Sequence, residues 1–193
     1  IKQKYLAEHR ESSEKVFSLL EKLPENISPK ILPAGAVLAG IKPTADNIKK
    51  YGMPISRIFE VEGTTPNGDT ILTRKEKLLK TVMDVSTIHG IDSALLYHSI
   101  DNVIGDKGLV VIHDDVRGSI QDVRAVESEY RKVALEVSQK YDIHEQILNA
   151  VEAYSPELAE TSEFISLKET ISQKIENRSK ILDDRFIIQR VYY

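Results

Sequence analysis

Imidazole and carboxylate side chains gather in the middle of the chain, where they could hold a metal ion. The cluster comprises His89, His98, His113, Asp114, Asp115 and Asp122. Histidine nitrogens and carboxylate oxygens are the ligands that divalent ions take in metal-dependent hydrolases and phosphohydrolases. On this interpretation the metal ligands are His89, His98, His113 and Asp114. The catalytic candidates are His113, Asp114 and Asp115, because a His beside a carboxylate can serve as a general base.

The same residues also have a structural interpretation. His89 falls near the end of one predicted helix, and His98 falls on the face of another. The His113–Asp115 segment follows an apolar run and begins a loop and a helix cap. We favour this interpretation, and the first expectation is therefore that the protein holds no cofactor. A divalent metal ion is the alternative.

Other catalytic signatures are missing from the sequence. The chain has no cysteine, which excludes disulfides, thiolate zinc sites and cysteine nucleophiles. It has no glycine-rich phosphate loop and no G-x-S-x-G elbow. The sequence therefore favours no particular enzyme class beyond the metal alternative.

Composition places the chain among globular proteins. Of its 193 residues, 41% are hydrophobic and 29% are charged, and the net charge is −4. Nucleic-acid binders usually carry a basic excess, because neutralising phosphates supplies much of their affinity. We therefore expect no nucleic-acid partner. No apolar run approaches the roughly 18–20 residues of a transmembrane helix, so we expect no membrane span.

Apolar periodicity and capping residues predict seven helices. Thr44, Ser119, Asp142 and Ser155 are the predicted N-caps of four of them, and T-x-x-E at Thr73 suggests another start. Gly90 and Gly105 are expected to end the third and fourth helices. The predicted ranges are 2–23, 44–51, 74–89, 93–104, 119–141, 142–154 and 156–182.

Two regions indicate β structure. Residues 57–73 alternate apolar and polar types around a turn that contains Asn67-Gly68, which predicts a hairpin. Residues 109–112 are wholly apolar and predict a short strand. Residues 31–41, broken by Pro33, Gly35 and Gly40, are expected to be a buried strand or an extended segment. The tail at 186–193 is apolar enough to dock as a last strand or helix turn.

These elements predict a helix-dominated α+β fold. We expect six or seven helices, a small central hairpin and a helical C-terminal half whose helices pack antiparallel, because their connections are short. The chain is read as a single domain, 1–193. The one seam lies near Gly118, between a mixed half at 1–118 and a helical half at 119–193.

Three functions from different classes remain open. The first is a protein–protein interaction domain of a larger bacterial or viral protein, such as an effector-type module, and it follows by elimination because the chain carries no catalytic motif. Its partner would be another protein or another part of a longer chain. The second is the metal-dependent hydrolase, and the third is an assembly domain that self-associates. The expected location is the cytoplasm or, after secretion, a host cytosol; the oligomeric state is left open.

Overall fold

The structure, a computed structural model, describes residues 2–24, 27–78, 80–103, 109–112 and 115–181. Within these ranges the fold is helix-dominated α+β, as predicted, with eight helices. The helices are α1 (Lys2–Glu21), α2 (Ala34–Leu38), α3 (Ala45–Tyr51), α4 (Lys80–Asp101), α5 (Ile120–Lys140), α6 (Ile143–Tyr154), α7 (Pro156–Ala159) and α8 (Ser162–Ile181).

The described strands form three separate two-stranded antiparallel sheets. The longest is a hairpin of nine-residue strands, in which Ser56 pairs with Leu78 at the base and Thr64 with Thr70 at the turn. Gly68 has φ +89° in that turn, a left-handed conformation that glycine adopts without strain. The strands are β1 (Lys30–Ile31) with β2 (Met53–Pro54), β3 (Ser56–Thr64) with β4 (Thr70–Leu78), and β5 (Val110–Ile112) with β6 (Asp115–Arg117).

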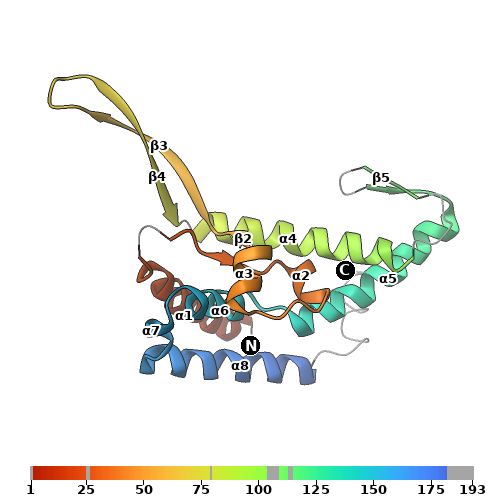
Figure 1. The fold of residues 1–193 in the computed structure, drawn as a ribbon. Coiled ribbons are helices and arrows are strands. Elements are labelled where there is room, and N and C mark those ends of the chain that lie inside the picture. The colour runs from red at the N-terminus through yellow and green to blue at the C-terminus, as the bar shows by residue number, and fades with distance from the viewer. Residues whose placement is uncertain (1, 25–26, 79, 104–108, 113–114, 182–193) are drawn as a thin grey trace.

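The elements divide into a helical body and an arm (Figure 1). The body contains α1, α6, α7 and α8 with the short β1–β2 sheet and α3 beside them. The arm, as the term is used below, consists of α4, α5 and the two hairpins β3–β4 and β5–β6. The β3–β4 hairpin rises from the N-terminal end of α4, and β5–β6 lies beyond its C-terminal end, at the start of α5.

The body is held by the larger of two apolar cores. Leu19 and Leu20 of α1, Ile147 of α6 and Phe164 of α8 are each at most 2% exposed within it. Burying a side chain of this size contributes about 1.5–3 kcal/mol. The core therefore ties the first helix of the chain to the last two long ones.

A smaller core joins α2 to the helices of the arm. Ala34 of α2, Ala94 of α4 and Val133, Val137 and Tyr141 of α5 are buried together. The Tyr141 hydroxyl donates to the Leu32 carbonyl at 3.3 Å. Both cores combine residues from before and after Gly118, so each half of the sequence contributes to each core.

Local capping chemistry explains where several helices begin. The Thr44 hydroxyl accepts from the Asn47 backbone N–H, and the Ser119 hydroxyl accepts from that of Asp122. The Asp142 carboxylate accepts from the backbone N–H groups of His144 and Glu145. These predictions of N-caps are confirmed. A side-chain oxygen can satisfy an otherwise unpaired N–H at any helix start.

The start of α4 was predicted wrongly. Thr73 and Glu76 lie in β4, which continues to Leu78, so the T-x-x-E pattern caps no helix. Pairing with β3 satisfies this backbone instead. Gly90 does not end the helix and no second helix starts at residue 93, because α4 is continuous from Lys80 to Asp101. An interior glycine costs a helix only about 1 kcal/mol, and the packing of α4 on α2 and α5 outweighs it.

Two further segments differ from expectation. Residues 31–41 form the end of β1 and the short helix α2 rather than one extended segment. The predicted helix at 156–182 is broken near Thr161, whose hydroxyl accepts from the Phe164 N–H and caps α8. The strand near 109–112 is confirmed as β5. The tail prediction at 186–193 lies outside the described residues.

No helix in the described ranges combines the length and the apolar character that crossing a bilayer requires.

Candidate functional site

The two predicted histidine ligands on α4 do not meet. They are nine residues apart on one helix, which separates His89 from His98 by about 13.5 Å along the axis and half a turn around it. Two histidines that share an ion each lie about 2.1 Å from it, so their nitrogens are within about 4 Å of each other. His89 is exposed, whereas His98 is half-buried with Nε2 3.3 Å from the Gly35 carbonyl oxygen.

Of the remaining candidates, the structure describes only Asp115 and Asp122. His113 and Asp114 lie outside the described residues, and Asp115 begins β6, in register with Ile112. Asp122 accepts a hydrogen bond from the Ser119 hydroxyl at 2.6 Å. In the described part of the chain, no three His, Asp or Glu residues assemble into a group that could hold a metal. The metal site at His113 and Asp114 stays a prediction.

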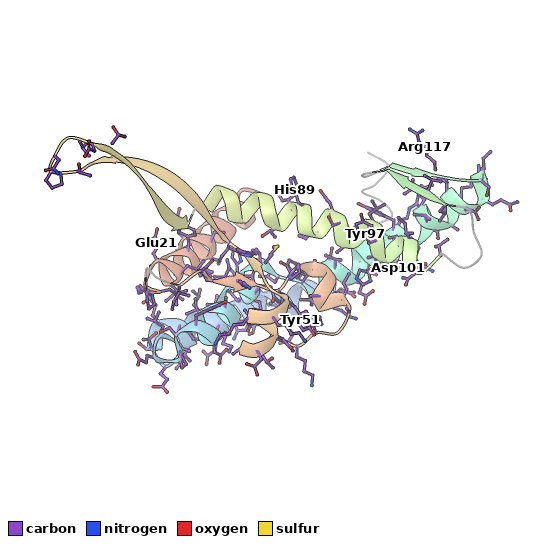
Figure 2. All side chains as sticks on the ribbon, turned by 45° about the horizontal axis from the view of Figure 1, so that its top comes forward. Glu21, Tyr51, His89, Tyr97, Asp101 and Arg117 are labelled. Atoms are coloured by element: carbon purple, nitrogen blue, oxygen red, sulfur yellow. The ribbon has the colours of Figure 1, made fainter. Side chains whose placement is uncertain are left out.

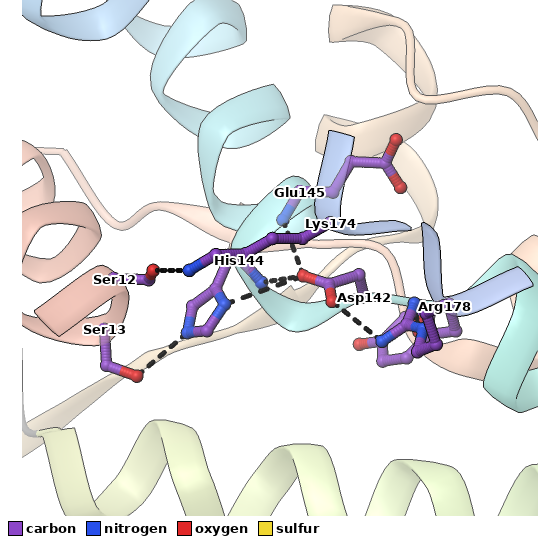
Figure 3. A network of polar contacts seen from close by, with 8 residues as sticks. Ser12, Ser13, Asp142, His144, Glu145, Lys174 and Arg178 are labelled. Atoms are coloured by element: carbon purple, nitrogen blue, oxygen red, sulfur yellow. Dashed lines mark hydrogen bonds and ion pairs between the residues drawn. The ribbon is translucent and has the colours of Figure 1, made fainter. Parts of the chain in front are cut away.

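A polar network joins three helices of the body (Figure 3). At its centre is Asp142, the N-cap of α6. Its Oδ1 accepts from the backbone N–H groups of His144 at 2.9 Å and Glu145 at 3.3 Å. Its Oδ2 accepts from Nη1 of Arg178 on α8 at 3.0 Å. Burial, followed by the nearby Asp142 charge, raises the pKa of the Glu145 carboxyl above its usual value.

The network extends to α1 through two serines. His144 Nε2 lies 2.9 Å from the Ser13 hydroxyl oxygen. Lys174 of α8 donates from its ammonium group to the hydroxyl of the buried Ser12. Both serines interrupt the apolar stripe of α1. Polar partners on α6 and α8 therefore explain why this face of α1 is not uniformly apolar.

Ser13, His144 and Asp142 have the residue types of a serine hydrolase triad, with the histidine between the other two. Their geometry does not suit catalysis. His144 Nδ1 is 3.7 Å from Asp142 Oδ1, too far for a hydrogen bond. The Asp142 carboxylate is already bound by two backbone N–H groups and Arg178. Ser13 lies inside α1, whose backbone N–H groups are used by the helix, so none is directed at an oxyanion. The three residues lock helices together.

Exposed apolar side chains concentrate on the arm. Seven large hydrophobic residues in the described part of the chain are exposed, and five of them come from α4, β5 and α5. Figure 2 labels Tyr97 on α4, and Arg117 near the far end of the arm. The five are Ile88, Tyr97, Val110, Ile120 and Tyr130, and Ile120 reaches 75% exposure. Clusters of exposed apolar side chains commonly mark interaction sites.

The β3–β4 hairpin projects away from the rest of the arm (Figure 1). In the described chain its main contact with another element is between β3 and α4, at the base of the hairpin. No third described strand pairs with either edge. A two-stranded hairpin without further support is marginally stable in water, and its free edges are templates for pairing with another chain.

Comparisons with protein-family models, with curated proteins and with solved structures find no match for this chain.

Sequence reasoning located the hairpin but missed the body network. Ser13 and His144 are 131 residues apart, and nothing in either local sequence indicates the other. Asp142 was recognised as a cap from its position before an apolar helix. Its second role, as the partner of Arg178, depends on how α8 returns across α6.

Proposed function

We propose that this protein is an interaction module that binds another protein through its arm. The observation that carries the proposal is the β3–β4 hairpin, whose two nine-residue strands have their main described contact with α4, at the base. A partner that covers the hairpin would add the support that a two-stranded sheet lacks on its own. The exposed apolar residues of α4, β5 and α5 would enlarge the same contact surface.

The proposal is supported by the way the polar groups of the body are used. Ser12, Ser13, Asp142 and His144 bind one another or α8, and this arrangement holds helices in place rather than facing a substrate. Among the described residues, five of the seven exposed large hydrophobic side chains are on the arm. Protein binding is therefore the function that best accounts for the arm.

The size of the protein in a native cell extract tests this function. A variant would cut the hairpin back to the pairs Ser56–Leu78 and Arg57–Lys77, closed by an Asn-Gly turn. A control would replace Gln173, which is exposed on α8, with Glu. Each protein would be followed by gel filtration, both in extract and after purification.

The wild type and the Gln173→Glu control should elute from extract well above the 21.8 kDa chain, and the shortened variant near its own size. After purification, each of the three proteins should elute near the size of its own single chain. Elution of the wild type in extract at the size of the single chain would contradict the proposal. A large species formed by the purified protein alone would instead show that the hairpin serves self-association.

A further inference from the structure

The register of the β3–β4 hairpin separates its charges by face. Residues directly opposite in an antiparallel pair share a face, and alternate residues along a strand return to it. Three cations therefore share one face, with Arg57 opposite Lys77 and Lys75 opposite Phe59. This face, called the basic face below, carries no acidic residue. Its positions are Arg57, Phe59, Val61, Gly63, Ile71, Thr73, Lys75 and Lys77.

The other face of the hairpin has a different charge pattern. It carries three glutamates, and one of them, Glu60, stands directly opposite Arg74. Opposite charges in such a pair stabilise the hairpin, whereas like charges directly opposite destabilise it. The basic face has the unfavourable arrangement, because Arg57 faces Lys77. Every charged position on this face is a cation.

An acidic group placed over the basic face would remove that repulsion. The cations occupy the two pairs of the face nearest α4, where Phe59 stands opposite Lys75, and Val61 and Ile71 lie toward the turn. A partner that matches this pattern has carboxylates at one end and apolar side chains at the other. A protein segment can carry both carboxylates and apolar side chains. The phosphate backbone of a nucleic acid supplies negative charge but no apolar side chains.

We infer that the basic face of the β3–β4 hairpin binds an acidic protein segment that also carries apolar side chains. The inference rests on the proposed function and names the chemistry of its partner. Positions 57, 59 and 61 are two residues apart along β3, about 7 Å for each step. A bound extended segment would present alternate residues at the same spacing.

The test uses the full chain and a defined probe, a fluorescein-labelled peptide of sequence Glu-Ser-Glu-Ser-Glu-Ser-Val-Ser-Val. As an extended strand it presents carboxylates and then valines along one face. One variant combines Arg57→Glu, Lys75→Glu and Lys77→Glu. The matched control combines Lys42→Glu, Lys49→Glu and Lys50→Glu, three exposed lysines at and before α3 that give the same change in net charge. Binding is read by fluorescence anisotropy.

The wild type and the α3 control should bind the peptide alike, and the hairpin variant about tenfold more weakly, as expected for the loss of three ion pairs. A peptide with Gln in place of each Glu should bind the wild type more weakly than the Glu peptide. A neutral variant with Gln at positions 57, 75 and 77 removes the repulsion within the hairpin and should also lose affinity. It separates lost binding from lost folding.

Equal binding by the hairpin variant and the α3 control would overturn the inference. Tighter, hairpin-dependent binding to mixed phosphatidylcholine–phosphatidylserine vesicles would overturn it in favour of a membrane surface. If the complex in native extract disappears when the hairpin is shortened but persists in the charge-reversed variant, the proposed function stands and this inference fails.

Discussion

Arg178, near the end of α8, donates from Nη1 to Oδ2 of Asp142 at 3.0 Å, and from Nη2 to the Tyr141 carbonyl at 3.3 Å. One guanidinium thus holds the junction between α5 and α6 against the last described helix. The contact is part-buried, and Asp142 caps α6 with its other oxygen. A single carboxylate therefore serves both a helix start and the packing of the body.

Two substitutions of Asp142 should separate the contribution of its bond to Arg178 from that of its helix cap. Asp142→Asn keeps a capping oxygen but weakens the bond to Arg178, and should lower the free energy of unfolding by about 1 kcal/mol. Asp142→Ala also removes the cap and should lower it by about 2–3 kcal/mol. Urea denaturation of both variants measures the difference. An Asp142→Ala protein as stable as the wild type would show that the network does not hold the body.

Gly52, the C-cap of α3, should not tolerate a side chain. A Cβ there would lie 2.3 Å from the Ile48 carbonyl oxygen and 2.8 Å from Lys30 Cβ, so the backbone would have to move. We expect Gly52→Ala to cost about 1–3 kcal/mol of stability. Gly35→Ala is the matched control, because its Cβ would meet Ala94 and His98 at an ordinary 3.9 Å. In thermal melts the control should match or slightly exceed the wild type, and a similar loss in both would contradict this account.

The buried Tyr141 hydroxyl should make the fold sensitive to alkali. Burial, followed by the nearby Asp142 charge, raises the pKa of this phenol above its usual value of about 10. Above that pH the unfolded chain loses the proton before the folded chain does, so stability falls as pH rises. Tyr141→Phe should cost about 0.5–1.5 kcal/mol at neutral pH, because the bond to the Leu32 carbonyl is lost.

The alkaline decline in stability should also be shallower in Tyr141→Phe than in the wild type. Tyr97→Phe is the control, since Tyr97 is 57% exposed and should change neither quantity. Urea melts at neutral pH and at a pH above 10 give both values. A decline of equal slope in wild type and Tyr141→Phe would assign the alkaline loss to other groups.

Divalent metals should leave the unfolding temperature unchanged. His89 and His98 are too far apart on α4 to share an ion. A site that uses all four predicted ligands together is therefore excluded. A metal that binds only the folded state at a hundredfold excess over its Kd adds about 2.7 kcal/mol. Stabilisation of the wild type but not of His113→Ala would therefore be visible, and it would favour the metal-dependent hydrolase.

The sequence was informative where structure is decided locally. Thr44, Ser119 and Asp142 were recognised as caps because an N-cap needs only its own oxygen and the next turn of backbone. The same logic failed at Thr73, where pairing with β3 decides the conformation. Long-range pairing is not encoded in a four-residue pattern.

Less of the candidate binding surface than of the fold could be predicted from the sequence. The hairpin was predicted from its alternation and its Asn-Gly turn, but its length and its separation from the body were not. Whether Tyr97 or Ile120 is exposed depends on which faces of α4 and α5 pack inward. The charge separation on the hairpin requires the register, because a shift of one residue would exchange its faces.

The most direct test of the interaction function places a photo-crosslinking amino acid at Pro66, in the turn of the β3–β4 hairpin, and irradiates cells that natively make the protein. Gln173 on α8 is the control position, since both residues are exposed. The account predicts one discrete adduct with another protein from position 66 and none from position 173. Absence of an adduct at position 66, or the same adducts from both positions, would contradict the claim that the hairpin binds a partner.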